Sequence, residues 1–143
     1  MFSIGAFAII LDKKGNVLLS HRRDIDAWNL PGGKAEAREL PDETVLREVK
    51  EETGLDVVIE RLVGVYGKAD KDEIVFAFVC RVVGGELVLS NEADRHCFFA
   101  PDKIPANTLP KQTERIQDAL NLTAQPIFRR QTSPSIHSVI GRA

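Results

Sequence analysis

The sequence predicts an α/β sandwich built around a mixed β-sheet. Apolar runs of β-like composition alternate with two segments of helical spacing. Some runs are joined by short turns, as in antiparallel hairpins, and others by longer connections that suit parallel neighbours. The 143 residues, 43% hydrophobic and 28% charged, match one ordinary globular domain. We therefore expect a single folded domain over residues 1–122.

The first third of the chain contains a predicted hairpin, a sharp break and a helix. Ser3 to Leu11 is predicted to be a strand, and the turn residues after it predict that Val17–Leu19 returns as its hairpin partner. Pro31-Gly32-Gly33 is a strong break, at which the backbone can approach another group closely. The next segment predicts a helix that begins at Pro41, because proline suits the first helical position. Gly54 ends it as a left-handed cap.

The rest of the domain is predicted to be strands and one further helix. Two long β-like runs are joined by a polar tip, and a Gly-Gly turn then leads to two shorter strands. Helical spacing returns before the tail. The expected elements are Leu55–Tyr66, Glu73–Val83, Glu86–Ser90, Cys97–Ala100 and Thr113–Leu122.

Residues 123–143 form a tail of different composition. The tail contains no Asp or Glu and is rich in Thr, Gln, Ser and Pro, which is typical of loops and disordered segments. We therefore predict that the tail is loop-like or partly disordered. It is basic, but about 20 residues do not make a DNA-reading module.

The charge balance and the cysteines limit the class of function. A net charge of −2 and a pI near 5.9 argue against binding to polymeric nucleic acid, which normally needs a basic face. Cys80 and Cys97 lie in apolar surroundings, so we predict two reduced core thiols. There is no signal-peptide pattern, and no run approaches the roughly 18–20 apolar residues that a membrane span needs. We expect a cytoplasmic protein without a membrane partner, and the apolar strands leave room for a homodimer.

Three glutamates on the predicted helix are the first candidates for chemistry. Glu48, Glu51 and Glu52 lie at positions i, i+3 and i+4, so they share one helix face. Carboxylates gathered in this way repel each other, and Mg²⁺ or Mn²⁺, which prefer oxygen ligands, would relieve that repulsion. The alternative is a solvated acidic face in which Arg47 and Lys50 are the partners. The Gly32-Gly33 loop before the helix favours the metal site, because bare backbone there can face a metal or a phosphate.

The segment from Gly33 to Leu55 resembles the Nudix box. That motif has fixed glycines, glutamates and an arginine at set spacings, with aliphatic residues at two positions. Every specified position matches, and the matching residues are Gly33, Glu39, Arg47, Glu48, Val49, Glu51, Glu52, Gly54 and Leu55. Arg38 departs from the common pattern, since many members have glycine there.

The resemblance implies a Nudix-type α/β/α sandwich and an enzyme that hydrolyses a nucleoside diphosphate linked to another group, X. It implies that Glu48, Glu51 and Glu52, with the carbonyl of Gly32, hold Mg²⁺ or Mn²⁺. Arg47 would orient these carboxylates by ion pairing, and Glu39 would either support them or bind a second metal ion. The ions would neutralise the diphosphate and lower the pKa of a bound water.

The general base is left open by the resemblance. Relatives differ in where they place this residue, and two glutamates of this chain are candidates. Glu52 lies within the box, and Glu92 precedes a predicted strand at a spacing similar to that of a catalytic glutamate in some relatives.

Four residues outside the box are candidates for contact with the substrate. Arg22 and Arg23 could reach a phosphate or a sugar acid, unless they form only a solvated strand end. Trp28 could stack on a base, although core packing is the favoured interpretation. Tyr66 lies where substrate contacts often fall in the family. Specificity is expected to come from the loops Lys68–Asp72 and Ile104–Lys111 and from the segment around His21.

The box predicts the chemistry and leaves X open. ADP-ribose or another nucleoside diphosphate sugar is favoured, and the alternative is a (d)NTP pyrophosphatase that removes oxidised nucleotides. A non-catalytic nucleotide sensor with the same fold belongs to another class of function. The complete box favours the enzyme.

Overall fold

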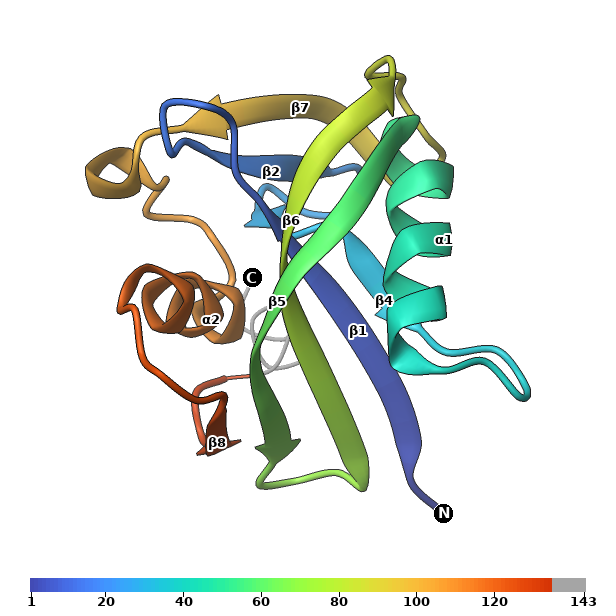
Figure 1. The fold of residues 1–143 in the computed structure, drawn as a ribbon, viewed down its shortest axis with the longest axis vertical. Coiled ribbons are helices and arrows are strands. Elements are labelled where there is room, and N and C mark those ends of the chain that lie inside the picture. The colour runs from blue at the N-terminus through green and yellow to red at the C-terminus, as the bar shows by residue number, and fades with distance from the viewer. Residues whose placement is uncertain (135–143) are drawn as a thin grey trace.

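A computed structural model describes residues 1–134 and contains two β-sheets and two α-helices. The larger sheet has the order β4-β1-β6-β5-β8, and the smaller has the order β3-β2-β7 (Figure 1). The strands of the larger sheet are β1 (Ser3–Ile10), β4 (Gly32–Lys34), β5 (Leu55–Lys68), β6 (Glu73–Gly85) and β8 (Ile127–Gln131). Those of the smaller sheet are β2 (Val17–Arg22), β3 (Trp28–Asn29) and β7 (Ala93–Phe99).

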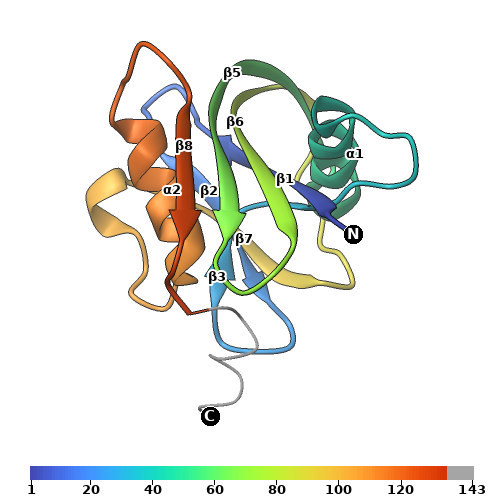
Figure 2. The same ribbon diagram turned by 90° about the horizontal axis from the view of Figure 1, so that it is seen from below.

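The larger sheet is mixed, and a helix covers each of its faces. The β1–β6 and β5–β8 pairs are parallel, whereas β1–β4 and β5–β6 are antiparallel. Helix α1 (Pro41–Thr53) lies on one side and α2 (Pro110–Leu120) on the other, as the view in Figure 2 shows. A short 3₁₀ helix, η1 (Pro101–Lys103), precedes α2. The predicted α/β/α sandwich with a mixed sheet is confirmed.

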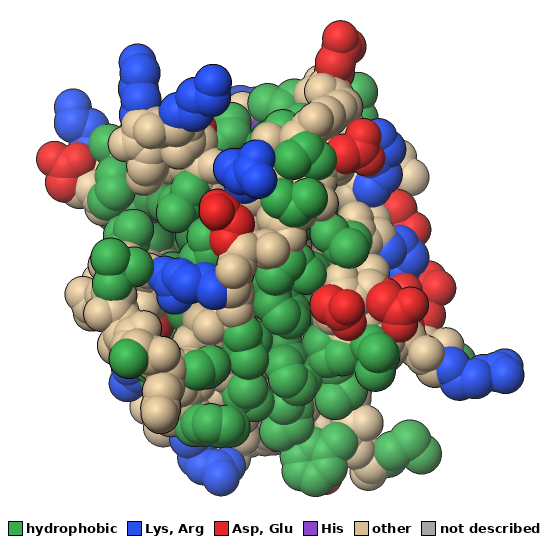
Figure 3. Space-filling view, in the orientation of Figure 1, with side chains coloured by type: hydrophobic (Ala, Val, Ile, Leu, Met, Phe, Trp, Pro, Cys, Tyr) green, Lys and Arg blue, Asp and Glu red, His purple; other side chains and the backbone are tan. Residues whose placement is uncertain are grey.

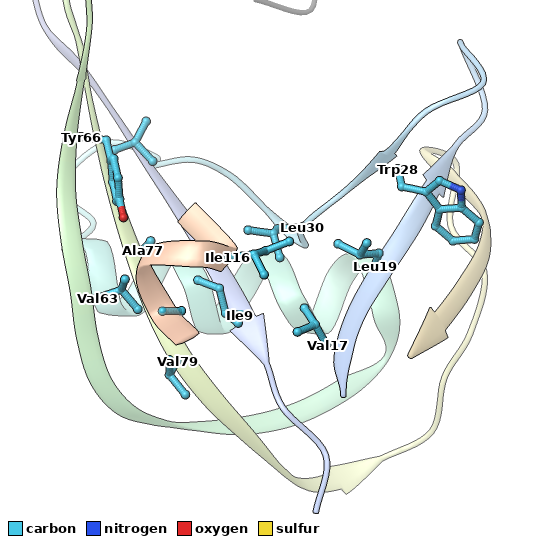
Figure 4. Close-up of a cluster of buried hydrophobic side chains, with 12 residues drawn as sticks. Ile9, Val17, Leu19, Trp28, Leu30, Val63, Tyr66, Ala77, Val79 and Ile116 are labelled. Atoms are coloured by element: carbon cyan, nitrogen blue, oxygen red, sulfur yellow. The ribbon is translucent and has the colours of Figure 1, made fainter. Parts of the chain in front are cut away.

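Two cores fill the layers between sheet and helices. Neighbouring residues of a strand point to opposite faces, so Ile9 packs in the core beneath α2 and Ile10 in the core beneath α1. Ile116 and Val63 belong to the first core, which Figure 4 shows. No helix within residues 1–134 is long and apolar enough to cross a membrane.

Helix α1 begins and ends where the sequence predicts. Its first helical residue is Pro41, and Gly54 closes it with φ 81°. Leu40 occupies the N-cap, where an aliphatic side chain cannot accept a hydrogen bond. Glu43 compensates, because its carboxylate accepts a bond from the backbone N–H of Leu40 at 2.9 Å. Arg38, just before the helix, adopts φ 64°, a conformation that favours glycine.

The predicted hairpin between the first two strands is wrong. Val17 meets Leu11 only in an isolated bridge, and β2 belongs to the smaller sheet. The reason is that β1 is already paired along both edges, with β4 on one side and β6 on the other. The turn after β1 therefore leads the chain from the larger sheet into the smaller one.

Two further expectations differ from the structure between β6 and β7. Glu86–Ser90 is not a strand, since Val88 donates its backbone N–H to the Thr53 carbonyl at 2.8 Å and so packs this segment against the end of α1. Cys97 is exposed and only Cys80 is buried. β7 pairs with β2 alone within the smaller sheet, so Cys97 lies on an edge strand with an uncovered side.

The loop-like prediction for the tail is wrong over residues 127–131. These residues form β8, which pairs in parallel with β5 from Gly64 to Lys68. The free edge of β5 supplies the hydrogen bonds that stabilise this strand, and such pairing leaves no local signal in composition. Residues 135–143 of the tail lie outside the described residues.

Candidate active site

The glutamate face of α1 packs directly on the backbone of β4. The N–H of Gly32 donates to Oε2 of Glu52 at 2.9 Å. A Cβ on Gly33 would lie 2.7 Å from the carboxyl carbon of Glu48, and a Cβ on Gly32 would lie 2.3 Å from the carbonyl oxygen of Ala6. Gly33 is therefore required for the close approach of β4 to α1, and Gly32 for the close approach of β4 to β1, which agrees with the predicted close backbone contact.

Arg47 connects the carboxylates of this face. It donates to Glu39 through Nε and Nη2, at 2.7 and 2.9 Å. Its Nη1 lies 3.0 Å from Oε1 of Glu48 and 3.2 Å from Oε2 of Glu51. Nη2 also donates to the carbonyl of Lys34 at 3.1 Å, so the same guanidinium joins α1 to β4.

The charges of the site are poorly compensated at its buried end. Burial raises the pKa of Glu52 to about 9, and the neighbouring charges of Glu48 and Glu92 act in the same direction. Burial also raises the pKa of Glu48, against the opposing effect of Arg47. Glu39 is the reverse case, because hydrogen bonds from Arg47 lower its pKa to about 2. A cation beside Glu52 would therefore stabilise the ionised carboxylates.

The donor set fits a hard divalent cation by its chemistry. Four carboxylates line one cavity of about 160 Å³, and Ser90 and Asn91 complete its wall; the four are Glu48, Glu51, Glu52 and Glu92. All the side-chain donors are oxygens, the ligands that Mg²⁺ and Mn²⁺ prefer. Within residues 1–134, no three carboxylate, histidine or cysteine side chains are already arranged around one point. The glutamates are instead satisfied by Arg47 and by the Gly32 N–H.

A larger cleft opens beside these carboxylates. Two adjoining cavities, of about 350 and 200 Å³, share Arg22, Asn29, Glu52 and Glu92 in their walls. Arg23 lines the first cavity, and its Nε donates to the Ser90 carbonyl at 2.9 Å. The structure therefore brings Glu92, Arg22 and Arg23 to the glutamate face of α1.

Tyr66 does not lie in this cleft, so its prediction as a substrate contact is wrong. Its side chain is fully buried, and its hydroxyl hydrogen-bonds to Oδ2 of Asp118 at 2.9 Å (Figure 4). Because β5 alternates, Tyr66 faces the core beneath α2 together with Val63.

Trp28 is also a core residue, which agrees with the packing interpretation favoured from the sequence. Its ring packs edge-on against His21 and Phe99, with centroids 5.1 and 5.0 Å away. The described cavities include no wall formed by Trp28. His21 is buried as well, between Asp26 and Asp94, each 2.8 Å from a ring nitrogen.

Several cleft residues have no signal in the sequence. Asn29, Gln112 and Arg115 line the cleft but belong to β3 and α2, which are remote from the motif. Arg115 looks like an ordinary polar position of an amphipathic helix. Lys68, Lys71 and Lys111 also line the cleft, within the two loops expected to set specificity.

Comparison with known proteins agrees with this architecture. The model of the NUDIX domain family matches residues 1–120. A Bacillus subtilis (strain 168) protein, named provisionally as an 8-oxo-dGTP diphosphatase, is 30% identical over 122 residues, which cover 85% of this chain and 82% of that protein. An ADP-ribose pyrophosphatase of Methanocaldococcus jannaschii is 37% identical over 103 residues, 67% of this chain and 61% of its own length.

A solved structure extends the likeness to three dimensions. The crystal structure of an ADP-ribose pyrophosphatase from Streptococcus suis 89-1591 superposes with a TM-score of 0.72 at 27% identity, and the match covers 90% of this chain and 98% of that one. With the box residues gathered at one cleft and the family model matching nearly the whole domain, the chain belongs to the Nudix hydrolase family.

Proposed function

We propose that this Nudix hydrolase is a metal-dependent pyrophosphohydrolase that cleaves a nucleoside diphosphate linked to a group X, with ADP-ribose or another nucleoside diphosphate sugar as the favoured substrate. One observation supports this most directly. The cavity lined by the four glutamates adjoins a cleft whose wall carries Arg22 and Arg23. A diphosphate can therefore meet oxygen ligands for cations on one side and arginine side chains on the other.

Glu48, Glu51 and Glu52 would hold Mg²⁺ or Mn²⁺, with the carbonyl of Gly32 as a further ligand. When bound, the ions neutralise the diphosphate and lower the pKa of a water. Arg47 keeps Glu48 and Glu51 at the site through its Nη1 contacts. Glu39 fixes Arg47 in turn, by accepting two of its hydrogen bonds.

Glu52 and Glu92 are the two candidates for the group that accepts the proton of the attacking water. They line the same cavities, and the charge of Glu92 contributes to the raised pKa of Glu52. Substitution of each glutamate distinguishes the role of metal ligand from that of general base. Loss of a metal ligand weakens metal binding, whereas loss of a base lowers turnover and removes the corresponding limb of the pH–rate profile.

The names of the relatives support two substrate classes. The Methanocaldococcus jannaschii relative is named for ADP-ribose, and the Bacillus subtilis relative for an oxidised nucleoside triphosphate. We favour the nucleoside diphosphate sugar and keep the oxidised (d)NTP as the alternative. A non-catalytic sensor is disfavoured because every specified residue of the box is present.

A substrate panel tests the proposal. The purified protein is incubated with Mg²⁺ or Mn²⁺ and with ADP-ribose, other nucleoside diphosphate sugars, oxidised and ordinary (d)NTPs, dinucleoside polyphosphates and NADH, and phosphate release is followed through a coupled phosphatase. We expect turnover of a nucleoside diphosphate sugar, and a loss of at least about 100-fold in the Glu52→Gln variant. Tight binding of one compound without turnover of any would instead indicate a sensor.

A further inference from the structure

The far end of the cleft holds two buried cations. Lys111 and Arg115 line the same cavity of about 200 Å³ as Glu52 and Glu92, but they come from α2, on the other side of the larger sheet from α1. Arg115 is 2% exposed and Lys111 is 8% exposed. Cations of this kind are rarely buried unless they are paired with an anion.

Within residues 1–134, neither cation forms an ion pair with a carboxylate. Arg115 donates to amide oxygens, to Gln131 Oε1 from Nε and Nη2 and to Gln112 Oε1 from Nη1. These bonds use three of the five N–H groups of the guanidinium. Lys111 donates to the carbonyl oxygen of Ser133. Residues 135–143 contain no Asp or Glu side chain that could supply the missing charge.

Aromatic rings face the guanidinium of Arg115, whereas burial acts against the charge of both cations. The guanidinium carbon of Arg115 lies 5.0 Å from the ring centre of Phe7 and 5.5 Å from that of Tyr66, and aromatic faces attract cations. Burial lowers the pKa of Arg115 to about 10, so it remains protonated at neutral pH. Burial also lowers the pKa of Lys111.

The position of Lys111 at the start of a helix is an independent indication. It lies in the first turn of α2, which contains no acidic residue. The helix dipole disfavours a cation at this end and favours an anion there. Lys71 lines the same cavity and is exposed, whereas Lys68 pairs with Glu73 at 3.1 Å and is thereby neutralised. An anion in the cleft would therefore meet three cations and a favourable helix end.

We propose that Lys111 and Arg115 form a subsite for a second anionic group of the substrate, a phosphoryl or a carboxylate beyond the scissile diphosphate. The proposal rests on the proposed function for the chemistry at the glutamates. Among the nucleoside diphosphate sugars, it favours those in which X carries a negative charge over ADP-ribose, in which X is a neutral ribose. A neutral sugar leaves both cations without a directly paired anion, since Asp70, Glu73 and Glu114 act on them only without an ion-pair contact. An anionic X places its charge between them while the diphosphate lies at Glu52.

Binding of inorganic phosphate, with divalent ions removed by a chelating resin, tests the subsite without any turnover. Under these conditions no metal ion at the glutamates can bind phosphate. The difference between the wild type and the Lys111→Met variant then separates binding at Lys111 from binding at Arg22 and Arg23. We expect saturable binding with a dissociation constant in the range of about 1–10 mM, weakened about 10-fold by Lys111→Met. Lys103→Met, in η1 and away from the described cavities, is the matched control and should bind as the wild type does.

A pair of substrates then identifies the group that is recognised. UDP-glucuronic acid and UDP-glucose differ only by a carboxylate in place of a hydroxymethyl group. We expect kcat/KM to favour the acid by at least about 10-fold in the wild type, and the preference to disappear in Lys111→Met. Calorimetry with acetate in place of phosphate separates a general carboxylate subsite from one that requires a phosphoryl group.

The outcomes that would overturn the subsite differ from those that would overturn the proposed function. No saturable phosphate binding, or equal binding by wild type and a folded Lys111→Met variant, removes the subsite even if the enzyme is active. If phosphate binding depends on Lys111 but the protein hydrolyses nothing in the panel, the anion subsite is supported and the proposed pyrophosphohydrolase activity is contradicted. Circular dichroism and thermal unfolding establish that Lys111→Met is folded.

Discussion

Arg47 and Glu39 form a two-bond ion pair, with Nε donating to Oε2 at 2.7 Å and Nη2 to Oε1 at 2.9 Å. The pair spans the junction at which the loop after β4 becomes α1. Through Nη1, the same arginine also reaches Glu48 and Glu51. The carboxylates that Arg47 contacts are therefore arranged around a shared cation, and they are not only a solvated face. Figure 3 shows acidic and basic side chains next to one another along the α1 side of the molecule.

Glu39→Gln should reduce the amount of folding stability that the protein loses as pH falls into the acid range. Arg47 lowers the pKa of Glu39 from its ordinary value of 4.5 to about 2. The folded state therefore holds this carboxylate ionised while the unfolded chain takes up a proton. Stability from the pair is complete above about pH 4.5 and is lost as pH falls toward about 2. Urea unfolding at about pH 5 and pH 3 should show a smaller loss in the variant than in the wild type.

The control for this measurement is Glu86→Gln. The Glu86 side chain is exposed and has no hydrogen bond or ion pair within residues 1–134. This variant should lose as much stability at acid pH as the wild type does. If Glu39→Gln also loses as much stability as the wild type, the pair contributes nothing measurable to folding.

Without divalent ions, the protein should become less stable as pH rises through neutrality. Glu52 has a pKa of about 9 in the folded state against an ordinary value of 4.5, so the folded state binds the extra proton between these values. Stability from this group therefore falls as pH increases from about 5 to about 9. Thermal unfolding across that range should show the fall in the wild type and less of it in Glu52→Gln.

Mg²⁺ or Mn²⁺ provides the complementary measurement. A divalent ion stabilises the ionised carboxylates and releases the proton on binding. Added metal should therefore raise the Tm of the wild type more at about pH 8.5 than at about pH 6. A Tm that does not respond to either ion at either pH would contradict metal binding at Glu52.

Gly33→Ala should impair the site without unfolding the domain. The added Cβ would lie within 2.9 Å of all three carboxyl atoms of Glu48, so that carboxylate must shift. Displacing the support of a metal ligand typically costs about 10–100-fold in metal affinity or activity. Gly67→Ala is the matched control, because a Cβ there meets nothing within 4 Å. Equal kcat/KM values for the two variants would show that the position of Glu48 is unimportant.

Tyr66→Phe should change stability and leave catalysis alone. The hydroxyl bonds to Asp118, which Arg129 also contacts at 2.8 and 3.0 Å. Losing one such buried bond costs about 1–2 kcal/mol of unfolding free energy. The KM for any substrate of the panel should be unchanged, since Tyr66 does not line the cleft. A several-fold rise in KM with unchanged stability would restore Tyr66 as a substrate contact.

Arg38→Gly should stabilise the protein. Arg38 is exposed and adopts φ 64°, where a residue with a Cβ loses roughly 1–2 kcal/mol relative to glycine. Part of that gain is offset by the greater freedom of glycine in the unfolded chain, so we expect about 0.5–1 kcal/mol in urea unfolding. Arg38→Ala keeps the Cβ and should show no gain. Equal changes in the two variants would assign the effect to the loss of the arginine side chain.

The features that depend on neighbouring residues of the chain could be predicted from the sequence. Pro41 and Gly54 set the limits of α1, and helical periodicity placed Glu48, Glu51 and Glu52 on one face. Gly32 and Gly33 indicated close backbone approach, and their contacts with Glu52 and Glu48 confirm it. These features depend on neighbours within a few turns of chain, and such interactions leave patterns in composition and spacing.

What lies opposite the glutamates was decided only by the tertiary structure. Periodicity tells which residues share a face of their own element, and it does not tell which element that face meets. The cleft therefore joins Glu52 to Glu92 before β7 and to Arg115 on α2, which no local pattern relates. Tyr66 is an opposite case. Its position in the sequence suggested a place in the site, but the alternation of side chains along β5 directs it into the core.

The same reason explains the strand pairing that the sequence could not supply. Both edges of β1 are occupied by distant strands, which excludes the expected hairpin, and the free edge of β5 makes a strand of Ile127–Gln131. An open strand edge must find hydrogen-bond partners, and any segment brought there by the fold can provide them. The sequence by itself determined the helix that carries the carboxylates, whereas long-range pairing and packing determined the walls of the cleft around them.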